Sequence, residues 1–252
     1  MLNNPTIEKL MDLKLKVMAQ MMKETEHNFL ELSFEERLGI MVEKEWLAKK
    51  NARIKRLLRN ASLGLTACIE DIDYSSQRTI DKQVIKTLST CAFIEQKLNI
   101  IISGKTGSGK SYLACAFGNN ACRQGYTVKY FRIPGLLLEI EHAKSENRYA
   151  KFMAGLQKVK LLILDDIGLK SYSLEESRDI LEIAEARYNQ GSTILAGQIP
   201  HAKWYNLFPD PTIADAIMDR FIHNSYILVL DSKQSMRAVT AEKIIQDTKK
   251  GN

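Results

Sequence analysis

The spacing of apolar positions divides the chain into two parts. The first part has helical spacing, and in the second part short apolar runs alternate with helical stretches. Residues 6–30 carry apolar side chains every three or four positions, which predicts a helix. Ser33, followed three positions later by Glu36, has the pattern of a capping box. We therefore expect a long helix to begin there and to end near Ala61. The polar run over residues 70–77 then indicates a linker.

Beyond this linker, short apolar runs alternate with stretches of helical spacing. The runs predict strands at residues 99–102, 126–131, 159–164, 192–196 and 226–230. Strands that alternate with helices imply right-handed crossovers, and hence a parallel sheet with helices on both faces. We expect an α/β fold in which a small all-α domain, residues 1–70, precedes a sheet domain, residues 71–252.

Basic residues are concentrated in one segment. The net charge is +6, and residues 44–60 hold seven basic side chains and a single acid, Glu45. Four apolar residues of the predicted long helix share one of its faces: Leu47, Ile54, Leu58 and Ala61. The opposite, cationic face favours a polyanion partner, and a solvated helix face is the alternative. The candidate contacts with the polyanion are Lys49, Lys50, Arg53, Lys55, Arg56 and Arg59.

The strongest chemical signal is a glycine-rich loop between a predicted strand and a predicted helix. It reads GKTGSGKS and matches the pattern G-x-x-x-x-G-K-[ST]. Its glycines allow the backbone to approach phosphates closely, and the helix adds the positive end of its dipole. Lys110 would reach the β- and γ-phosphates of ATP, and Ser111 would ligate Mg²⁺. The candidate ATP-binding residues are Gly104, Lys105, Thr106, Gly107, Ser108, Gly109, Lys110 and Ser111.

Polar residues also follow the next two predicted strands. Asp165 and Asp166 end an apolar run, which places them at the carboxyl edge of the sheet, where ligands bind. We expect Asp165 to hold Mg²⁺ and Asp166 to orient or deprotonate the attacking water, with an ordinary acidic turn as the alternative. Gln198 is placed to bond the γ-phosphate or that water, or it is a plain loop residue.

Two arginines are candidates for contact with the γ-phosphate. Arg220 follows a helical stretch and suits an arginine finger offered to a neighbouring subunit. The alternative is an ion pair of Arg220 with Asp215 or Asp219. Arg237 is a further cation that would touch the γ-phosphate.

The composition of the chain limits the cellular compartments in which we expect the protein to act. No apolar stretch approaches the roughly 20 residues that cross a bilayer, so we expect no membrane partner. The start of the chain has no signal-peptide pattern. The four cysteines form no CxxC pair, which makes zinc and disulfides unexpected and favours a reducing cytoplasm.

With these motifs in place, the chain resembles the IstB-like transposition helper ATPases. These belong to the AAA+ superfamily, near the DnaC-type helicase loaders. The resemblance runs from about Asn4 to about Val239. It is carried by residues 32–38, 104–111, 161–168, 198–204, 210–220 and 235–237.

The resemblance implies roles for the candidate residues. Asp165 and Asp166 would be the Walker B pair, Gln198 sensor 1, Arg220 the arginine finger and Arg237 sensor 2. It also implies ATP-controlled self-association on duplex DNA, into a higher oligomer or filament. The assembly would remodel target DNA and recruit and stimulate the transposase of the same element, in a bacterial cytoplasm at the nucleoid.

Several positions depart from the family pattern. Asp166 stands where many AAA+ enzymes have Glu, so we expect slow hydrolysis that DNA or oligomerisation stimulates. Gly197 replaces a common Ser, and Lys233 replaces a common Gly. Only 15 residues follow Arg237, so we expect a reduced or absent helical lid and a nucleotide site completed by a neighbour.

Other functions fit less well. A replicative helicase loader of the DnaC type would share the ATPase core but would dock a helicase and prefer single strands. A P-loop kinase needs a phosphoacceptor pocket and an arginine-rich lid, and the sequence suggests neither. The chain is not expected to be the recombinase, because its acidic pair belongs to the Mg·ATP site.

Overall fold

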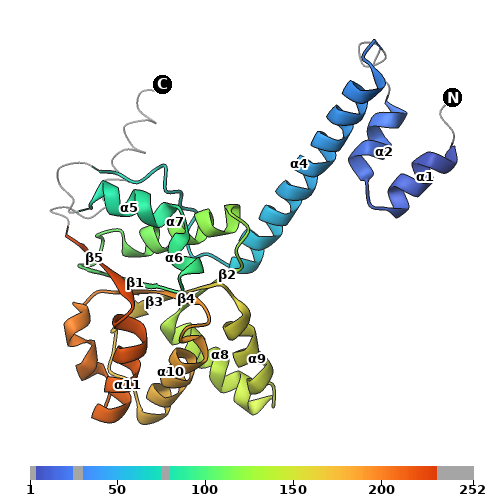
Figure 1. Cartoon of the computed structure of the whole chain (residues 1–252). Coiled ribbons are helices and arrows are strands. Elements are labelled where there is room, and N and C mark those ends of the chain that lie inside the picture. Colours follow the sequence, from blue (N-terminus) through green and yellow to red (C-terminus); the bar gives the residue numbers. More distant parts are fainter. Residues whose placement is uncertain (1–3, 25–30, 75–79, 232–252) are drawn as a thin grey trace, which may run out of the picture. The chain divides into compact units, whose positions relative to one another are not determined.

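A computed structural model describes residues 4–24, 31–74 and 80–231 of the chain (Figure 1). The chain divides into two compact units, Met1–Arg56 and Leu57–Asn252. The first unit is helical, and the second contains the sheet. The expected domain limit at residue 70 stays a prediction. Within the described residues, no helix has the length and apolar character needed to cross a membrane.

The N-terminal unit begins with two short helices, α1 (Asn4–Asp12) and α2 (Lys16–Lys23). The helical spacing predicted over residues 6–30 is confirmed where the structure describes it, but the structure divides this range into two helices. Lys14 adopts φ +58°, a left-handed conformation that ends α1 and turns the chain. The apolar spacing continues on both sides of this turn, so the pattern alone did not show it. The last part of the predicted range, residues 25–30, lies outside the described residues.

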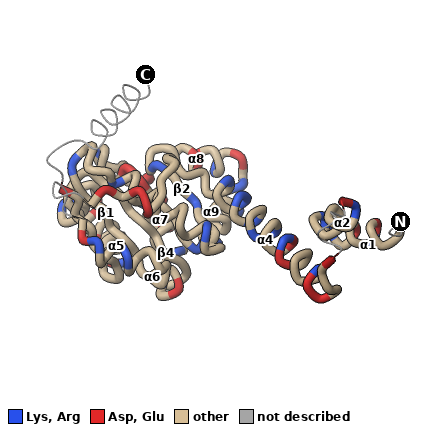
Figure 2. The backbone as a smooth tube through the Cα atoms, turned by 90° about the horizontal axis from the view of Figure 1, so that it is seen from above, with Lys and Arg blue, Asp and Glu red and all other residues tan. Residues whose placement is uncertain are grey.

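The long helix α4 (Phe34–Ala61) begins where the capping box predicted. The backbone N–H of Ser33 donates to Oε2 of Glu36 at 2.8 Å, and the N–H of Glu36 donates to Oγ of Ser33 at 3.2 Å. Figure 2 shows acidic residues in the first half of α4 and basic residues in the second. The predicted apolar stripe is wrong at Leu47, which is 42% exposed, whereas Ala61 is fully buried in the second unit.

One acidic residue of α4 faces inward instead. Glu45 is only 6% exposed, and its Oε2 accepts hydrogen bonds from the backbone N–H groups of Val17 (2.8 Å) and Met18 (3.1 Å). These amides begin α2, whose own N-cap, Leu15, has no side-chain acceptor. Helix N-termini leave such amides without intrahelical partners. Glu45 therefore caps α2 from a neighbouring helix and stabilises the N-terminal unit.

The second unit is built on a five-stranded sheet with the order β2-β3-β4-β1-β5. Every neighbouring pair is parallel, which confirms the predicted parallel sheet. The five predicted strands are all present, with small shifts at their ends. They are β1 (Asn99–Gly104), β2 (Val128–Arg132), β3 (Leu161–Ile167), β4 (Ser192–Gly197) and β5 (Ser225–Leu230).

Helices cover both faces of this sheet, as expected (Figure 1). Besides the end of α4, the described residues of this unit form the helices α5 (Lys82–Ser89), α6 (Ala92–Glu95), α7 (Lys110–Arg123), α8 (Ile133–Ser145), α9 (Tyr149–Lys158), α10 (Leu174–Arg187), the 3₁₀ helix η1 (His201–Leu207) and α11 (Pro211–Ile222). Alternate side chains of β1 face opposite ways. Ile100 and Ile102 pack with α5, α6 and α7, whereas Ile101 packs with α8 to α11. Each face thus has its own buried apolar core, and the loops at the strand ends remain available for a site.

Candidate functional site

The glycine-rich loop connects β1 to α7 at the carboxyl edge of the sheet. Gly104 has φ +155°, and a Cβ atom there would lie 2.1 Å from the backbone oxygen of Leu230 on β5. Any side chain at this position would therefore collide with backbone. Gly109 is the N-cap of α7 with φ +92°, and it has no side chain to cover the first amides of the helix. The loop thus allows close backbone approach next to the first amides of a helix, the features a phosphate requires.

Two polar side chains of the loop are held by defined contacts. Lys110 is only 8% exposed, and its ammonium donates to the backbone oxygen of Lys105 at 2.9 Å, inside the loop. Thr106 donates its hydroxyl proton to Oε1 of Gln198 at 2.8 Å. Gln198 directly follows β4, which pairs with β1, so the sheet brings these residues together. The predicted proximity of Gln198 to the phosphate loop is therefore present in the structure.

The residues present also fit a magnesium ion bound with the nucleotide. Ser111 lies in the first turn of α7, beside Lys110. Asp165 lies on β3 and is 2% exposed. A hydroxyl and a carboxylate are the oxygen ligands that Mg²⁺ prefers when it also binds phosphates.

The two acids of β3 have different surroundings. Oδ2 of Asp165 accepts a hydrogen bond from the hydroxyl of Tyr130 at 2.9 Å, and Oδ1 accepts one from the N–H of Asp166 at 2.8 Å. Asp166 adopts φ +63°, at a point where the pairing of β3 with β4 shifts register. Its carboxylate accepts a hydrogen bond from Nε of Arg132 at 2.5 Å. The irregular backbone therefore directs the two carboxylates to separate partners.

Tyr130 and Arg132 were not identified from the sequence. Both lie on β2, where Tyr130 pairs with Ile163 and Arg132 with Asp165 of β3. Burial, and then the charge of Asp165, raise the pKa of Tyr130, so its hydroxyl remains a donor. The hydrogen bond to Asp166 raises the pKa of Arg132. Polar residues at alternate positions of a predicted strand were the available signal, but only the strand order assigns them to β3.

Arg220 lies near the end of α11 and is engaged within its own chain. Its guanidinium donates to the backbone oxygen of Ala216 at 2.9 Å and to Oε1 of Glu185 on α10 at 3.0 Å. Among the described residues, its ion-pair partner is thus Glu185 and neither aspartate considered from the sequence. Arg237, the other candidate cation, lies outside the described residues.

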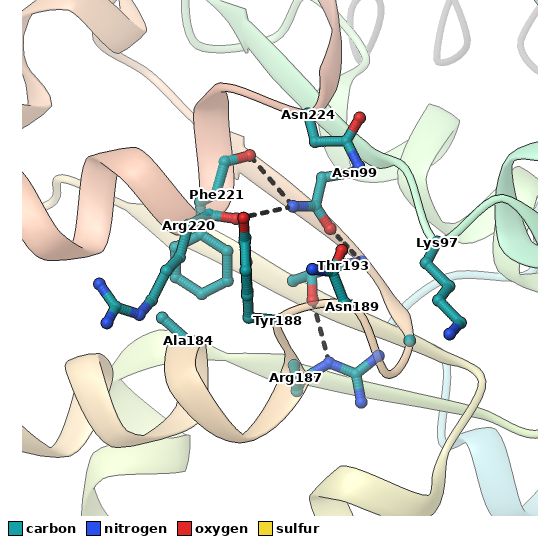
Figure 3. Close-up of a pocket in the computed structure, with 11 residues that line it drawn as sticks. Lys97, Asn99, Ala184, Arg187, Tyr188, Asn189, Thr193, Arg220, Phe221 and Asn224 are labelled. Carbon is teal, nitrogen blue, oxygen red and sulfur yellow. Dashed lines mark hydrogen bonds between the residues drawn. The ribbon is translucent and has the colours of Figure 1, made fainter.

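The backbone of Arg220 lies at the opposite edge of the sheet from the phosphate loop. Its carbonyl contacts Asn99, the first residue of β1, whereas the loop begins at Gly104, the last (Figure 3). Five steps along a strand span about 16 Å.

Arg187 lines the same polar hollow as Arg220 but has a structural role (Figure 3). Its side chain is 2% exposed and donates to the carbonyls of Leu156, Val159 and Ser192 and to the hydroxyl of Thr193. Burial lowers the pKa of Arg187 to about 10. Its donors are used by the ends of neighbouring strands, so Arg187 stabilises the sheet edge.

The candidate polyanion contacts all lie on α4 and are exposed. Lys49 is 3.8 Å from the buried Glu45, and the ammonium of Lys50 lies 4.7 Å from the ring centre of Trp46. Because Glu45 turns inward, every charged side chain exposed in residues 44–60 is basic. The candidate contacts among them are Lys49, Lys50, Arg53, Lys55, Arg56 and Arg59.

Comparisons with known proteins agree with these features. A family model described as IstB-like ATP binding protein matches residues 8–243. A Sinorhizobium fredii protein named as an insertion sequence ATP-binding protein is 39% identical over 239 residues, 94% of this chain and 97% of that protein. An insertion sequence ATP-binding protein of Pseudomonas fluorescens is 38% identical over 206 residues, 79% of this chain and 88% of that protein.

Solved structures share the fold of the second unit. DnaI has a TM-score of 0.56 at 20% identity, over 70% of this chain and 94% of that chain. The DnaC helicase loader has a TM-score of 0.54 at 18% identity, over 66% of this chain and 97% of that chain. At such identities the likeness concerns the fold alone, and it confirms the expected P-loop AAA+ arrangement.

Proposed function

The chain belongs to the family of IstB-like ATP binding proteins, and on that premise we propose that it is an ATP-dependent helper of DNA transposition. In this proposal, ATP joins subunits into a higher oligomer or filament on duplex DNA. The assembly remodels the target and recruits and stimulates the transposase of the same insertion element. The placement of Arg220 at the sheet edge opposite its own phosphate loop carries the proposal, because it suits a site shared between subunits.

The positions of the side chains support the proposed hydrolytic roles. The loop amides and Lys110 bind the phosphates, and Gln198 contacts the γ-phosphate or the attacking water from the end of β4. Ser111 and Asp165 would hold Mg²⁺, which would neutralise charge on the phosphate oxygens. Asp166 orients the water or accepts its proton as the water oxygen attacks γ-phosphorus, and ADP and inorganic phosphate leave.

Arg132 restrains this reaction in an isolated subunit. It holds the carboxylate of Asp166 in an ion pair, and Asp166 has to leave that contact to act on a water. Arg220 completes the site only when a neighbour supplies it. Both features support slow hydrolysis that assembly or DNA accelerates.

The cationic face of α4 supports contact with duplex DNA. Each phosphate neutralised on binding contributes a slope of about −0.9 to the dependence of log affinity on log salt concentration. Contacts of lysines and arginines with phosphates carry little sequence information, so binding depends weakly on sequence. In an assembly, each subunit presents one copy of this cationic face to the double helix, and binding through many copies at once is stronger.

An exposed apolar ridge on α4 supports engagement of a protein partner. Phe34, Leu38, Val42 and Trp46 are spaced four residues apart and are 66, 41, 50 and 54% exposed. Residues at this spacing form one continuous row on a helix surface. Exposed apolar surfaces of this kind mark protein contacts, and we assign this ridge to the transposase.

Electron microscopy of the protein with duplex DNA tests the proposal. Rings or filaments on duplex DNA should form with ATP but not with ADP or without nucleotide. Lys110→Ala, which removes the phosphate-binding ammonium, should prevent them. Equal binding of single subunits under all conditions would contradict the proposal.

A replicative helicase loader is the second candidate, favoured by the fold shared with the DnaC loader. Capture experiments with a transposase and with a replicative helicase distinguish the two. Transposase capture and a preference for duplex DNA support the helper. Helicase capture and a preference for single strands support the loader.

A further inference from the structure

Asn99, at the start of β1, uses its buried side chain to join three segments of the chain. The residue is 7% exposed, and its Nδ2 donates to the carbonyls of Arg220 and Phe221, each at 3.2 Å (Figure 3). Its Oδ1 accepts a hydrogen bond from the backbone N–H of Thr193 on β4 at 2.8 Å. The amide therefore satisfies both its donor and its acceptor groups inside the protein.

These bonds fix the end of α11. The last carbonyls of a helix have no intrahelical partners, so a donor from outside determines how the final turn sits. Asn99 supplies that donor to two successive carbonyls, and its own backbone N–H donates to Asn224 just beyond the helix at 2.8 Å. The side chain of Arg220 donates to the carbonyl of Ala216 in its own helix and pairs with Glu185, and a partly exposed ion pair of this kind orders a side chain only weakly. Asn99 thus adds contacts from outside the helix that fix the backbone at Arg220 and Phe221.

The strand that carries Asn99 also carries the phosphate loop. β1 pairs with β4 on one side and β5 on the other, and Ile100, Ile101 and Ile102 are fully buried. Such a strand behaves as a rigid element. Its amino end holds Arg220 through Asn99, and its carboxyl end holds the loop through Gly104.

We propose that Asn99 is the positioning residue for Arg220, the arginine that one subunit offers to the nucleotide bound by its neighbour. This inference rests on the proposed function, in which the ATP site is shared between subunits. Loss of the Asn99 amide leaves the subunit's own phosphate loop intact and displaces the arginine that it supplies. The defect therefore acts on the neighbouring subunit.

Mixing two defective variants tests this directly. Asn99→Ala subunits keep the loop, and Lys110→Ala subunits keep Arg220. We expect Asn99→Ala alone to lower the kcat for ATP at least tenfold, with the KM for ATP and the affinity of the isolated subunit for ATP unchanged. In an equal mixture, about a quarter of head-to-tail interfaces combine the two intact halves, so the ATPase rate should recover toward a quarter of the wild-type rate.

A parallel mixture separates the failure of this inference from the failure of the proposed function. Arg220→Ala mixed with Lys110→Ala should also recover activity. A second outcome is that only the mixture with Arg220→Ala recovers, while the mixture with Asn99→Ala gives no more than the sum of the rates of its two separate variants. That outcome would show that Asn99 acts only within its own subunit. Recovery in neither mixture would overturn both the shared site and the role of Asn99.

A second variant and a control guard against a general loss of folding. Asn99→Asp keeps the size and the acceptor for Thr193 but removes both donors, so it should show the same defect in the neighbour; wild-type activity would overturn the proposal. The matched control is Asn120→Ala on α7, whose amide donates to the carbonyl of Ser89 at 2.7 Å. That variant should keep the wild-type kcat. Far-ultraviolet circular dichroism checks the fold of each variant.

Discussion

The hydroxyl of Thr106 donates a hydrogen bond to the side-chain oxygen of Gln198 at 2.8 Å. This bond joins the phosphate loop to the end of β4, two segments that are distant in the sequence. The bond uses only the oxygen of the Gln198 side-chain amide. The N–H groups of that amide take no part in it. Gln198 is therefore held beside the phosphate loop, where the proposed function requires a donor to the γ-phosphate.

Gln198→Ala should lower the kcat for ATP about 10- to 100-fold, because it removes one donor to the charge that develops during hydrolysis. The affinity for ATP should change much less, since the other loop contacts remain. Steady-state ATPase assays and binding of a fluorescent nucleotide measure the two quantities. Thr106→Val, which removes only the tether, serves as the comparison and should have the smaller effect. An unchanged kcat in Gln198→Ala would show that the residue is only part of the loop.

Arg132→Ala should raise the ATPase rate measured without DNA about two- to fivefold. The change frees the carboxylate of Asp166 from an ion pair whose arginine side chain is 63% exposed, and pairs of this kind contribute about 1 kcal/mol or less. Stimulation by DNA, expressed as a ratio, should fall. Asp166→Asn in the same background should abolish the gain. A lower rate in Arg132→Ala would assign Arg132 a direct part in hydrolysis.

Glu45→Ala should destabilise the N-terminal unit by about 1–3 kcal/mol, because two amides at the start of α2 lose their buried acceptor. Glu45→Gln keeps one acceptor oxygen and should lose less. Chemical denaturation followed by fluorescence of the exposed Trp46 measures the change in free energy of unfolding. ATP binding, which depends on the second unit, should be unaffected in both variants.

Replacing Lys49, Arg53 and Arg56 together by Ala should weaken binding to duplex DNA and flatten its salt dependence. If each contacts one phosphate, the slope of log affinity against log salt changes by about 3. Fluorescence anisotropy over a salt series measures the slope, and ATP binding should remain intact. A matched variant that replaces Lys9, Lys16 and Lys23 removes three charges from α1 and α2 and should bind normally. An unchanged slope in the first variant would exclude this face of α4.

Stability should fall as the pH rises above about 9. Burial raises the pKa of Cys122 to about 12 and that of Cys91 to about 11, whereas the reference value is 9.0. Between these values the unfolded thiols lose protons that the folded thiols keep, so rising pH favours the unfolded state. Thermal unfolding from pH 8 to 11 measures the effect. Cys122→Ala should show a shallower decline than the parent protein, and an identical decline would rule out this thiol.

Much of the fold could be predicted because its signals are local. The loop from Gly104 to Ser111 is recognisable from its glycines and from its place between a strand and a helix. The start of α4 at Ser33 follows from a capping pattern four residues long. The five strands follow from short apolar runs, and their alternation with helices indicates a parallel sheet. Each of these depends on neighbours in the chain and on backbone preferences that a short window contains.

Tyr130, Arg132, Glu45 and Asn99 had no such signal, although each has a defined role. Their partners lie on other elements, so the roles depend on strand order, register and burial. Asp165 meets Tyr130 because β2 and β3 pair in one register, and Arg220 meets Asn99 because α11 ends beside β1. Glu45, one acid in a basic segment, faces the start of α2. Local preferences determine which elements form. Which side chains meet is a consequence of packing those elements into one core, and that depends on distant parts of the chain at once.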